Sequence, residues 1–147
     1  MADMILAVFV PGTPVAKGST HAFAHKTTGR IITMQTNAKR QKPWASLIAL
    51  SAKEAMSGGP VDGPVSIDIA FTMPRPKNHY RTGKNAALLK DGAPAYHTKT
   101  PDIDKLVRCV LDALTGVAWH DDSQVWHVNS AKHYGRAEGA AIKVFRP

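Results

Sequence analysis

The chain has 147 residues, of which 44% are hydrophobic and 20% are charged. This length matches one domain, and this balance excludes a largely disordered chain. Cys109 is the only cysteine in the sequence, which excludes an internal disulfide and a multi-cysteine zinc site. Nineteen basic residues against eleven acidic ones give a net charge of +8. Such a surface field favours a polyanion, such as a nucleic acid, as the partner.

Residues 4–10 form an apolar run that is far too short to cross a bilayer. No basic segment precedes this run, and no small-residue cleavage site follows it. We therefore expect a protein that is neither exported nor bound to a membrane. A single cysteine also suits the reducing conditions of the cytoplasm.

Glycine and proline residues divide the chain into alternating segments. Residues 4–10 are predicted to form a strand, which is followed by a polar loop as far as about residue 30. Residues 43–56 are predicted to form a helix with Pro43 in its first turn. The predicted inner face of this helix consists of Trp44, Leu47, Ile48 and Ala55.

Residues 65–73 show the clearest strand pattern, because apolar and polar side chains alternate along them. Residues 74–101 contain four prolines and many basic groups, and are predicted to form a long basic loop. Long loops in compact domains are usually functional or mobile. Residues 103–115 carry apolar side chains at helical spacing and end at Gly116, which predicts a second helix.

Two further strands are predicted at residues 125–131 and 141–145. The resulting order is strand, helix, strand, long loop, helix, strand, strand. This order predicts an α+β fold, with a mixed β-sheet and two main helices in a single domain that covers residues 1–147.

Two aspartates, Asp102 and Asp104, stand where the second helix begins. A helix N-cap and the helix dipole are sufficient to explain Asp102, and they explain Asp104 in part. Arg108 follows Asp104 by four residues, so the two side chains can reach each other along the helix.

A second acidic pair, Asp121 and Asp122, lies between this helix and the next strand. Adjacent aspartates commonly occupy a turn, although nothing local requires two of them here. If either joined Asp102 and Asp104 in space, a cation would be needed to relieve their repulsion. Oxygen ligands of this kind favour Mg²⁺ or Mn²⁺ over zinc. Such ions on a basic surface are suited to phosphodiester hydrolysis.

The segment PDIDKLVRCVLDALTG, followed by HDDSQV, resembles the RusA family of Holliday junction resolvases, many of which are encoded by phages and prophages. The shared features are an Asp-x-Asp, a basic residue four positions later, an Asp-Ala-Leu-Thr helix end and an Asp-Asp-x-Gln-Val. The resemblance implies a small homodimeric endonuclease in a bacterial cell that requires Mg²⁺, with Mn²⁺ as a substitute, and nicks four-way DNA junctions symmetrically.

The resemblance also assigns roles to individual residues. It places the catalytic carboxylates at Asp102, Asp104 and Asp122. The same three residues and the neighbouring Asp121 would bind the metal. Arg108 stands where the best-known member has a catalytic lysine. A guanidinium keeps its proton, so Arg108 would supply positive charge to the phosphate and no proton.

Several basic residues are candidates for DNA binding. Those that we single out are Lys17, Arg75, Lys77, Lys99 and Lys132. The long loop mixes basic and aromatic side chains, as loops that contact DNA do, although its charges would equally keep a solvated loop soluble. Lys132 is included because the family often has a lysine there.

Other functions remain open at this point. The chain could be a divalent-metal nuclease that acts on flaps, single strands or RNA, or a non-catalytic basic DNA-binding protein. A zinc site is disfavoured, because His21 and His25 lack a third ligand nearby. Cys109 is predicted to be a buried, inert thiol.

Overall fold

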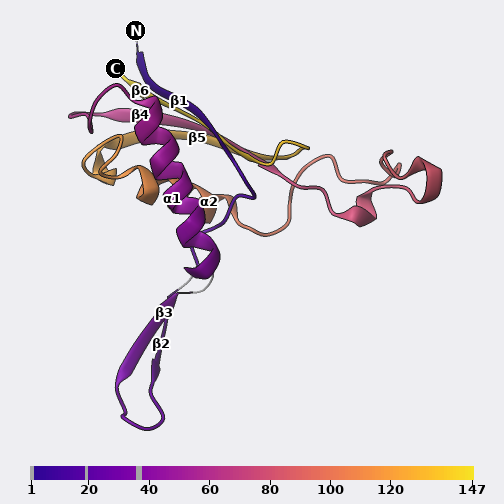
Figure 1. Cartoon of the computed structure of the whole chain (residues 1–147), viewed down its shortest axis with the longest axis horizontal. Coiled ribbons are helices and arrows are strands. Elements are labelled where there is room, and N and C mark those ends of the chain that lie inside the picture. Colours follow the sequence, from indigo (N-terminus) through magenta and orange to yellow (C-terminus); the bar gives the residue numbers. More distant parts are fainter. Residues whose placement is uncertain (1, 19, 36–37) are drawn as a thin grey trace.

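The computed structural model describes residues 2–18, 20–35 and 38–147. Its centre is a four-stranded sheet in the order β1-β6-β4-β5. The strands are β1 (Asp3–Pro11), β4 (Val65–Met73), β5 (Val125–Tyr134) and β6 (Gly139–Arg146). β6 is antiparallel to both β1 and β4, whereas β4 and β5 are parallel, so the sheet is mixed. The helices α1 (Ala38–Ala55) and α2 (Ile103–Leu114) lie over one face of this sheet (Figure 1).

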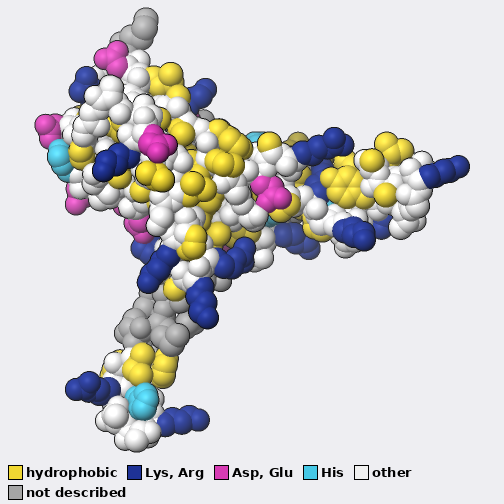
Figure 2. Space-filling model, viewed as in Figure 1, with side chains coloured by type: hydrophobic (Ala, Val, Ile, Leu, Met, Phe, Trp, Pro, Cys, Tyr) yellow, Lys and Arg dark blue, Asp and Glu magenta, His cyan; other side chains and the backbone are white. Residues whose placement is uncertain are grey.

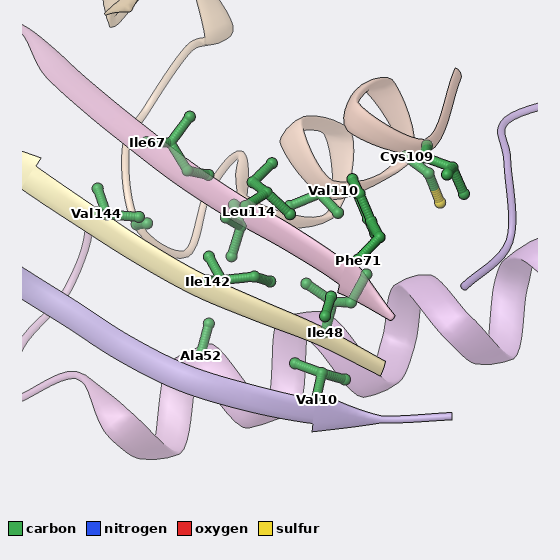
Figure 3. Close-up of a cluster of buried hydrophobic side chains, with 14 of the residues drawn as sticks. Val10, Ile48, Ala52, Ile67, Phe71, Cys109, Val110, Leu114, Ile142 and Val144 are labelled. Atoms are coloured by element: carbon green, nitrogen blue, oxygen red, sulfur yellow. The ribbon is translucent and has the colours of Figure 1, made fainter. Parts of the chain in front are cut away.

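The core forms between the two helices and the sheet (Figure 3). Alternate residues of β4 are buried, as the period of two predicts. The side chains that β4 buries are Val65, Ile67, Ile69, Phe71 and Met73. α2 contributes Leu106, Cys109, Val110 and Leu114 to the same layer. The α+β fold with a mixed sheet and two helices is therefore confirmed.

The first helix differs from its prediction. α1 starts at Ala38, and Pro43 lies inside it instead of in the first turn. Trp44 and Ile48 are buried as expected, but Leu47 is 37% exposed and Ala55 is also exposed. The buried residue after Ile48 is Ala52, so the core side of α1 follows a spacing of four residues and is narrower than predicted.

The polar segment that follows β1 was predicted to be a loop as far as about residue 30. This prediction is wrong for residues 20–24, whereas residues 12–18 and 25–30 have no regular secondary structure. β2 (Thr20–Ala24) and β3 (Ile31–Gln35) form an antiparallel hairpin that projects from the domain (Figure 1). Its turn is closed by the His25 N–H, which donates to the carbonyl oxygen of Arg30 at 2.7 Å. Phe23 and Ile31 are 46% and 71% exposed, so the described side chains of this hairpin, at residues 22–24 and 31–32, do not show the half-buried alternation by which strands are recognised in a sequence.

Residues 74–101 project from the domain as a second extension, in a different direction from the hairpin (Figure 1). They lack regular strands, as predicted, but contain the 3₁₀ turns η1 (Lys77–His79) and η2 (Gly83–Asn85). We call residues 75–99 the basic arm. Among the described residues, no helix combines the length and the apolar character needed to cross a bilayer.

Candidate active site

Asp102 occupies the N-cap position of α2, where an aspartate usually accepts a hydrogen bond from the first turn. Here the side chain makes no capping hydrogen bond. It is 56% exposed, and its Oδ2 lies 3.4 Å from Nζ of Lys105. A helix cap therefore does not account for this carboxylate, which is accessible to a ligand.

Lys132 in β5 holds the backbone that leads into Asp102. Its Nζ donates to the carbonyl oxygens of Lys99 at 2.6 Å and Pro101 at 2.9 Å. Lys132 pairs in register with Phe71 of β4, on the face of the sheet that the helices cover. These two bonds join the end of β5 to the start of α2. An ammonium has three N–H donors, so Lys132 can still offer one to a phosphate.

A cavity of about 530 Å³ opens beside Asp102. One wall is the segment 13–18, and another is the base of the basic arm. Asp102 is the single carboxylate among the described residues that line it. The cationic residues of the lining are Lys17, Arg40, Lys99 and Lys105. The cavity therefore combines one exposed carboxylate with four positive charges, which suits an anionic strand.

Lys17 joins the first wall of the cavity to α2. Its backbone N–H donates to the carbonyl oxygen of Lys105 at 3.1 Å, and its Nζ lies 2.5 Å from Oδ2 of Asp112. Both groups of this ion pair are partly exposed, so the pair contributes little to stability. Its main consequence is to place the Lys17 ammonium along α2.

His97 lies in the second wall and is 9% exposed. Its ring centroid is 4.9 Å from that of Tyr134. Nδ1 of His97 is buried and has no hydrogen-bond partner among the described residues. Burial, and then the positive charge of Lys132, lower the pKa of His97 from its usual value of 6.5. The fold therefore favours the neutral imidazole.

Asp122 lies at the other end of α2. Its Oδ1 accepts hydrogen bonds from Oγ1 of Thr115 and, at 3.0 Å, from Nε1 of Trp119. Trp119 is fully buried, so this bond gives its indole N–H a partner. Both bonds use Oδ1, and they therefore also fix the direction in which Oδ2 of Asp122 points.

Asp121 and Gln124 form a reciprocal capping box around the 3₁₀ turn η3 (Asp122–Gln124). Asp121 Oδ1 accepts from the backbone N–H of Ser123 at 2.8 Å, and this bond lowers the pKa of Asp121. Gln124 Oε1 accepts from the backbone N–H groups of His120 and Asp121. The turn therefore accounts for Asp121, whereas Asp122 points to α2.

The full length of α2 separates the two acidic sites. Asp102 precedes its first turn, and Asp122 bonds to the residue after its last turn; twelve helical residues rise about 18 Å. Asp104 and Arg108 are exposed on α2 and do not line the cavity. Within the described parts of the chain, no three His, Cys, Asp or Glu side chains form a group that could hold a metal ion. A single chain therefore does not bring the predicted metal ligands together.

The remaining candidates for DNA binding divide into two groups. Lys17 and Lys99 line the cavity. Arg75 lies at the base of the basic arm, where its guanidinium stacks on Tyr134, and Lys77 lies farther along the arm.

The structure adds site residues that the sequence analysis did not single out. Lys105 follows Asp102 by three residues, so helical spacing could have identified it. Arg40 reaches the cavity from α1, and Trp119 reaches Asp122 from a turn. Only the packing of α1 against α2 brings Arg40 to this place.

Comparison with known proteins identifies the family. The family model described as Endodeoxyribonuclease RusA matches residues 11–145. The chain belongs to the RusA family. It is also similar to the uncharacterized protein YqaN of Bacillus subtilis (strain 168), with 33% identity over 135 residues that cover 92% of each chain. The protein is thus an endodeoxyribonuclease, a hydrolytic enzyme of a family that resolves Holliday junctions and generally uses a divalent metal.

Proposed function

We propose that this RusA-family protein nicks four-way DNA junctions symmetrically in the cytoplasm of a bacterial cell, with Mg²⁺ as its metal and Mn²⁺ as a substitute. The observation that carries the proposal is the cavity beside Asp102, where an uncapped carboxylate meets four cationic side chains. The cations would hold the scissile phosphodiester and neutralise its developing charge. The carboxylate would stand next to the phosphorus.

The bound metal would supply activation of water and stabilisation of the leaving oxygen. We propose Asp102, Asp104 and Asp122 as its ligands, with Asp121 acting on the turn that presents Asp122. Because about 18 Å of helix separates the two ends, one chain supplies only part of this set. A complete set requires a second copy.

A homodimer meets this requirement. If two α2 helices lie antiparallel about a twofold axis, the start of each helix faces the end of the other. Two equivalent sites then form, each with Asp102 and Asp104 from one copy and Asp122 from the other. Two equivalent sites match two symmetric nicks in a four-way junction.

The basic residues have separable roles in this proposal. Lys99 would contact the phosphate from the base of the arm, and Lys17 would do so from the other wall by exchanging its ion pair with Asp112 for the phosphate. Lys132 positions the backbone before Asp102 and offers its third donor to the DNA. Arg108 contributes charge alone, because its guanidinium remains protonated.

The test is cleavage of a labelled four-way junction and of its linear duplex, with Mg²⁺ and with chelator. We expect symmetric nicks in the junction alone, and only with metal. Asp102→Asn and Asp104→Asn should abolish cleavage. The matched control is Asp68→Asn, which changes a carboxylate between the buried residues Ile67 and Ile69 of β4 and hence on the face away from α2.

Other results would replace the proposal. Cleavage of flaps, single strands or RNA in preference to the junction would indicate a different divalent-metal nuclease. Tight junction binding with no cleavage in Mg²⁺ or Mn²⁺ would indicate a DNA-binding protein that has lost the family's activity.

A further inference from the structure

The basic arm is attached to the end of β5 by a cluster of rings. The Arg75 guanidinium carbon lies 4.5 Å from the centroid of the Tyr134 ring, and Arg75 also donates to the carbonyl oxygen of Pro94 at 2.7 Å. The rings of His79 and His97 lie 5.3 Å and 4.9 Å from the same tyrosine. Both ends of the arm, where it leaves and rejoins the domain, are therefore held against one residue of the sheet.

Beyond this base, the arm folds back on itself. Tyr80 and Leu89 form an antiparallel bridge, and the Arg81 N–H donates to the carbonyl oxygen of Leu88 at 2.8 Å. The Arg81 side chain donates to the Leu89 carbonyl oxygen at 3.2 Å and to Asp91 at 2.9 Å. The arm is thus a folded element that is held in one orientation relative to the sheet, and not merely a solvated loop.

Most of the protein's net charge lies on the arm. Residues 75–99 contain six Lys and Arg residues and one acidic residue, a net charge of +5 against +8 for the whole chain. Asp91 pairs with Arg81, whereas Lys77, Lys84 and Lys90 have no ion-pair partner among the described residues. The side chains of these three lysines are exposed, and Figure 2 shows Lys and Arg side chains in dark blue on the projecting arm.

Apolar side chains lie among these lysines. Leu88 is 53% exposed and Leu89 is 40% exposed. Exposed apolar side chains beside cations suit the groove of a DNA duplex, where they can pack against the bases while the cations contact the phosphates. A second copy of this chain is a poorer occupant, because its own net charge of +8 would repel the arm.

The base of the arm forms a wall of the cavity through Pro76, His97 and Lys99, but the three unpaired lysines do not line it. DNA on the outer arm is therefore a different segment from the strand in the cavity. In a branched substrate, two duplexes diverge from one point and can occupy both places.

We propose that the outer part of the arm, residues 77–90, binds a duplex of the branched substrate other than the one being cut. This contact gives the protein its preference for branched over linear DNA. The inference rests on the proposed function for the identity of the substrate.

The test compares two variants with the same loss of charge. The arm variant is Lys77→Gln, Lys84→Gln and Lys90→Gln, and the control variant is Lys53→Gln, Lys143→Gln and Arg146→Gln. Fluorescence anisotropy in chelator measures the affinity for a four-way junction and for a linear duplex, between about 50 and 200 mM salt. We expect the arm variant to bind the junction about tenfold more weakly or worse, with a log–log salt slope lower by about 3. The affinity for the linear duplex should change by the same factor in both variants.

A second variant tests the orientation of the arm separately from its charge. Arg75→Lys keeps the positive charge but cannot reproduce the planar stacking on Tyr134 together with the bond to Pro94. We expect a several-fold loss of junction preference, because junction binding should weaken more than binding of the linear duplex.

Equal effects of the arm and control variants would overturn the inference, as would equal weakening of junction and duplex binding by the arm variant. A change in the oligomeric mass of the arm variant would overturn it in favour of a second copy as the occupant. Because binding is measured without metal, the arm can contribute to junction affinity even if the wild-type protein cuts nothing. Conversely, suppose that the wild-type protein cuts junctions while the arm variant binds them with unaltered affinity. That result would refute the role of the arm and leave the proposed function standing.

Discussion

The Nζ atom of Lys132 lies 2.9 Å from the carbonyl oxygen of Pro101, the residue immediately before Asp102. Lys132 belongs to the central sheet, whereas Pro101 ends the long segment that contains the basic arm. This hydrogen bond therefore couples the rigid part of the fold to the carboxylate that we place at the centre of catalysis. Residues that orient metal ligands in this way commonly change activity without touching the metal.

Lys132→Met should slow junction cleavage by about 10- to 100-fold and raise the Mg²⁺ concentration required for half-maximal rate. The reason is that the backbone before Asp102 loses both of its ammonium bonds. Cleavage rates over a Mg²⁺ titration measure the effect. Lys143→Met, in the exposed part of β6, is the control and should cleave normally. An unchanged Mg²⁺ requirement in Lys132→Met would contradict the positioning role.

Mixing Asp102→Asn with Asp122→Asn should restore cleavage that neither variant shows alone. If each site uses carboxylates from two copies, a mixed dimer contains one intact site and one site with both changes. If the two variants assort at random, about half of the dimers are mixed, and each has one intact site out of two. About a quarter of the sites present in the wild-type protein are then intact. The products should be single nicks, without symmetric resolution. No recovery, with mixed dimers demonstrated by different affinity tags on the two variants, would rule out a site shared between copies.

Gln124→Leu should destabilise the fold by about 2 kcal/mol, because its amide links the turn η3 to the chain before β4. Nε2 of Gln124 donates to the carbonyl oxygens of Val61 at 2.9 Å and Gly63 at 2.8 Å. Urea unfolding measures the loss. Gln124→Glu keeps the acceptor but sets a carboxylate oxygen against the two carbonyl oxygens, so it should destabilise the fold at least as much as Gln124→Leu. A loss below about 0.5 kcal/mol for Gln124→Leu would show that these bonds contribute little.

His97 should make the fold less stable as the pH falls below 6.5, its usual pKa. Its pKa is lowered in the fold, so the unfolded chain takes up a proton first and gains stability relative to the native state. The stabilising effect of neutral His97 is complete above pH 6.5 and is lost as the pH falls through the folded-state pKa. His97→Phe keeps a ring beside Tyr134 but cannot titrate. Thermal unfolding at about pH 7.5 and 5.5 should therefore show a smaller decline for the variant. An equal decline would assign the effect to other histidines.

Cys109 should resist thiol reagents in the native protein. It is fully buried in α2, and burial, followed by the charge of Asp112, raises its pKa to about 11. At about pH 8, the thiolate fraction is then near one in a thousand. Reaction with a chromogenic disulfide should occur only after unfolding in denaturant. Rapid labelling of the native protein would show that α2 opens readily.

Periodic patterns of apolar residues in the sequence determine the strands and helices in which they occur. The alternation along residues 65–73 and the helical spacing after Asp102 predicted β4 and α2, because periodic burial is a property of each element by itself. The acidic motifs in and after α2 also identified the family, which was later shown by the match over residues 11–145. The hairpin β2–β3 escaped prediction because its described side chains, at residues 22–24 and 31–32, are not buried in the core.

Tertiary structure decided which of these residues meet. The sequence placed Asp102 and Asp122 in adjacent motifs, but α2 holds them at opposite ends, since a helix is a rigid spacer. The packing of α1 against α2 brought Arg40 to the cavity, and the length of β5 brought Lys132 to Pro101. Such contacts depend on distances through space between residues far apart in the chain, and no local pattern encodes them.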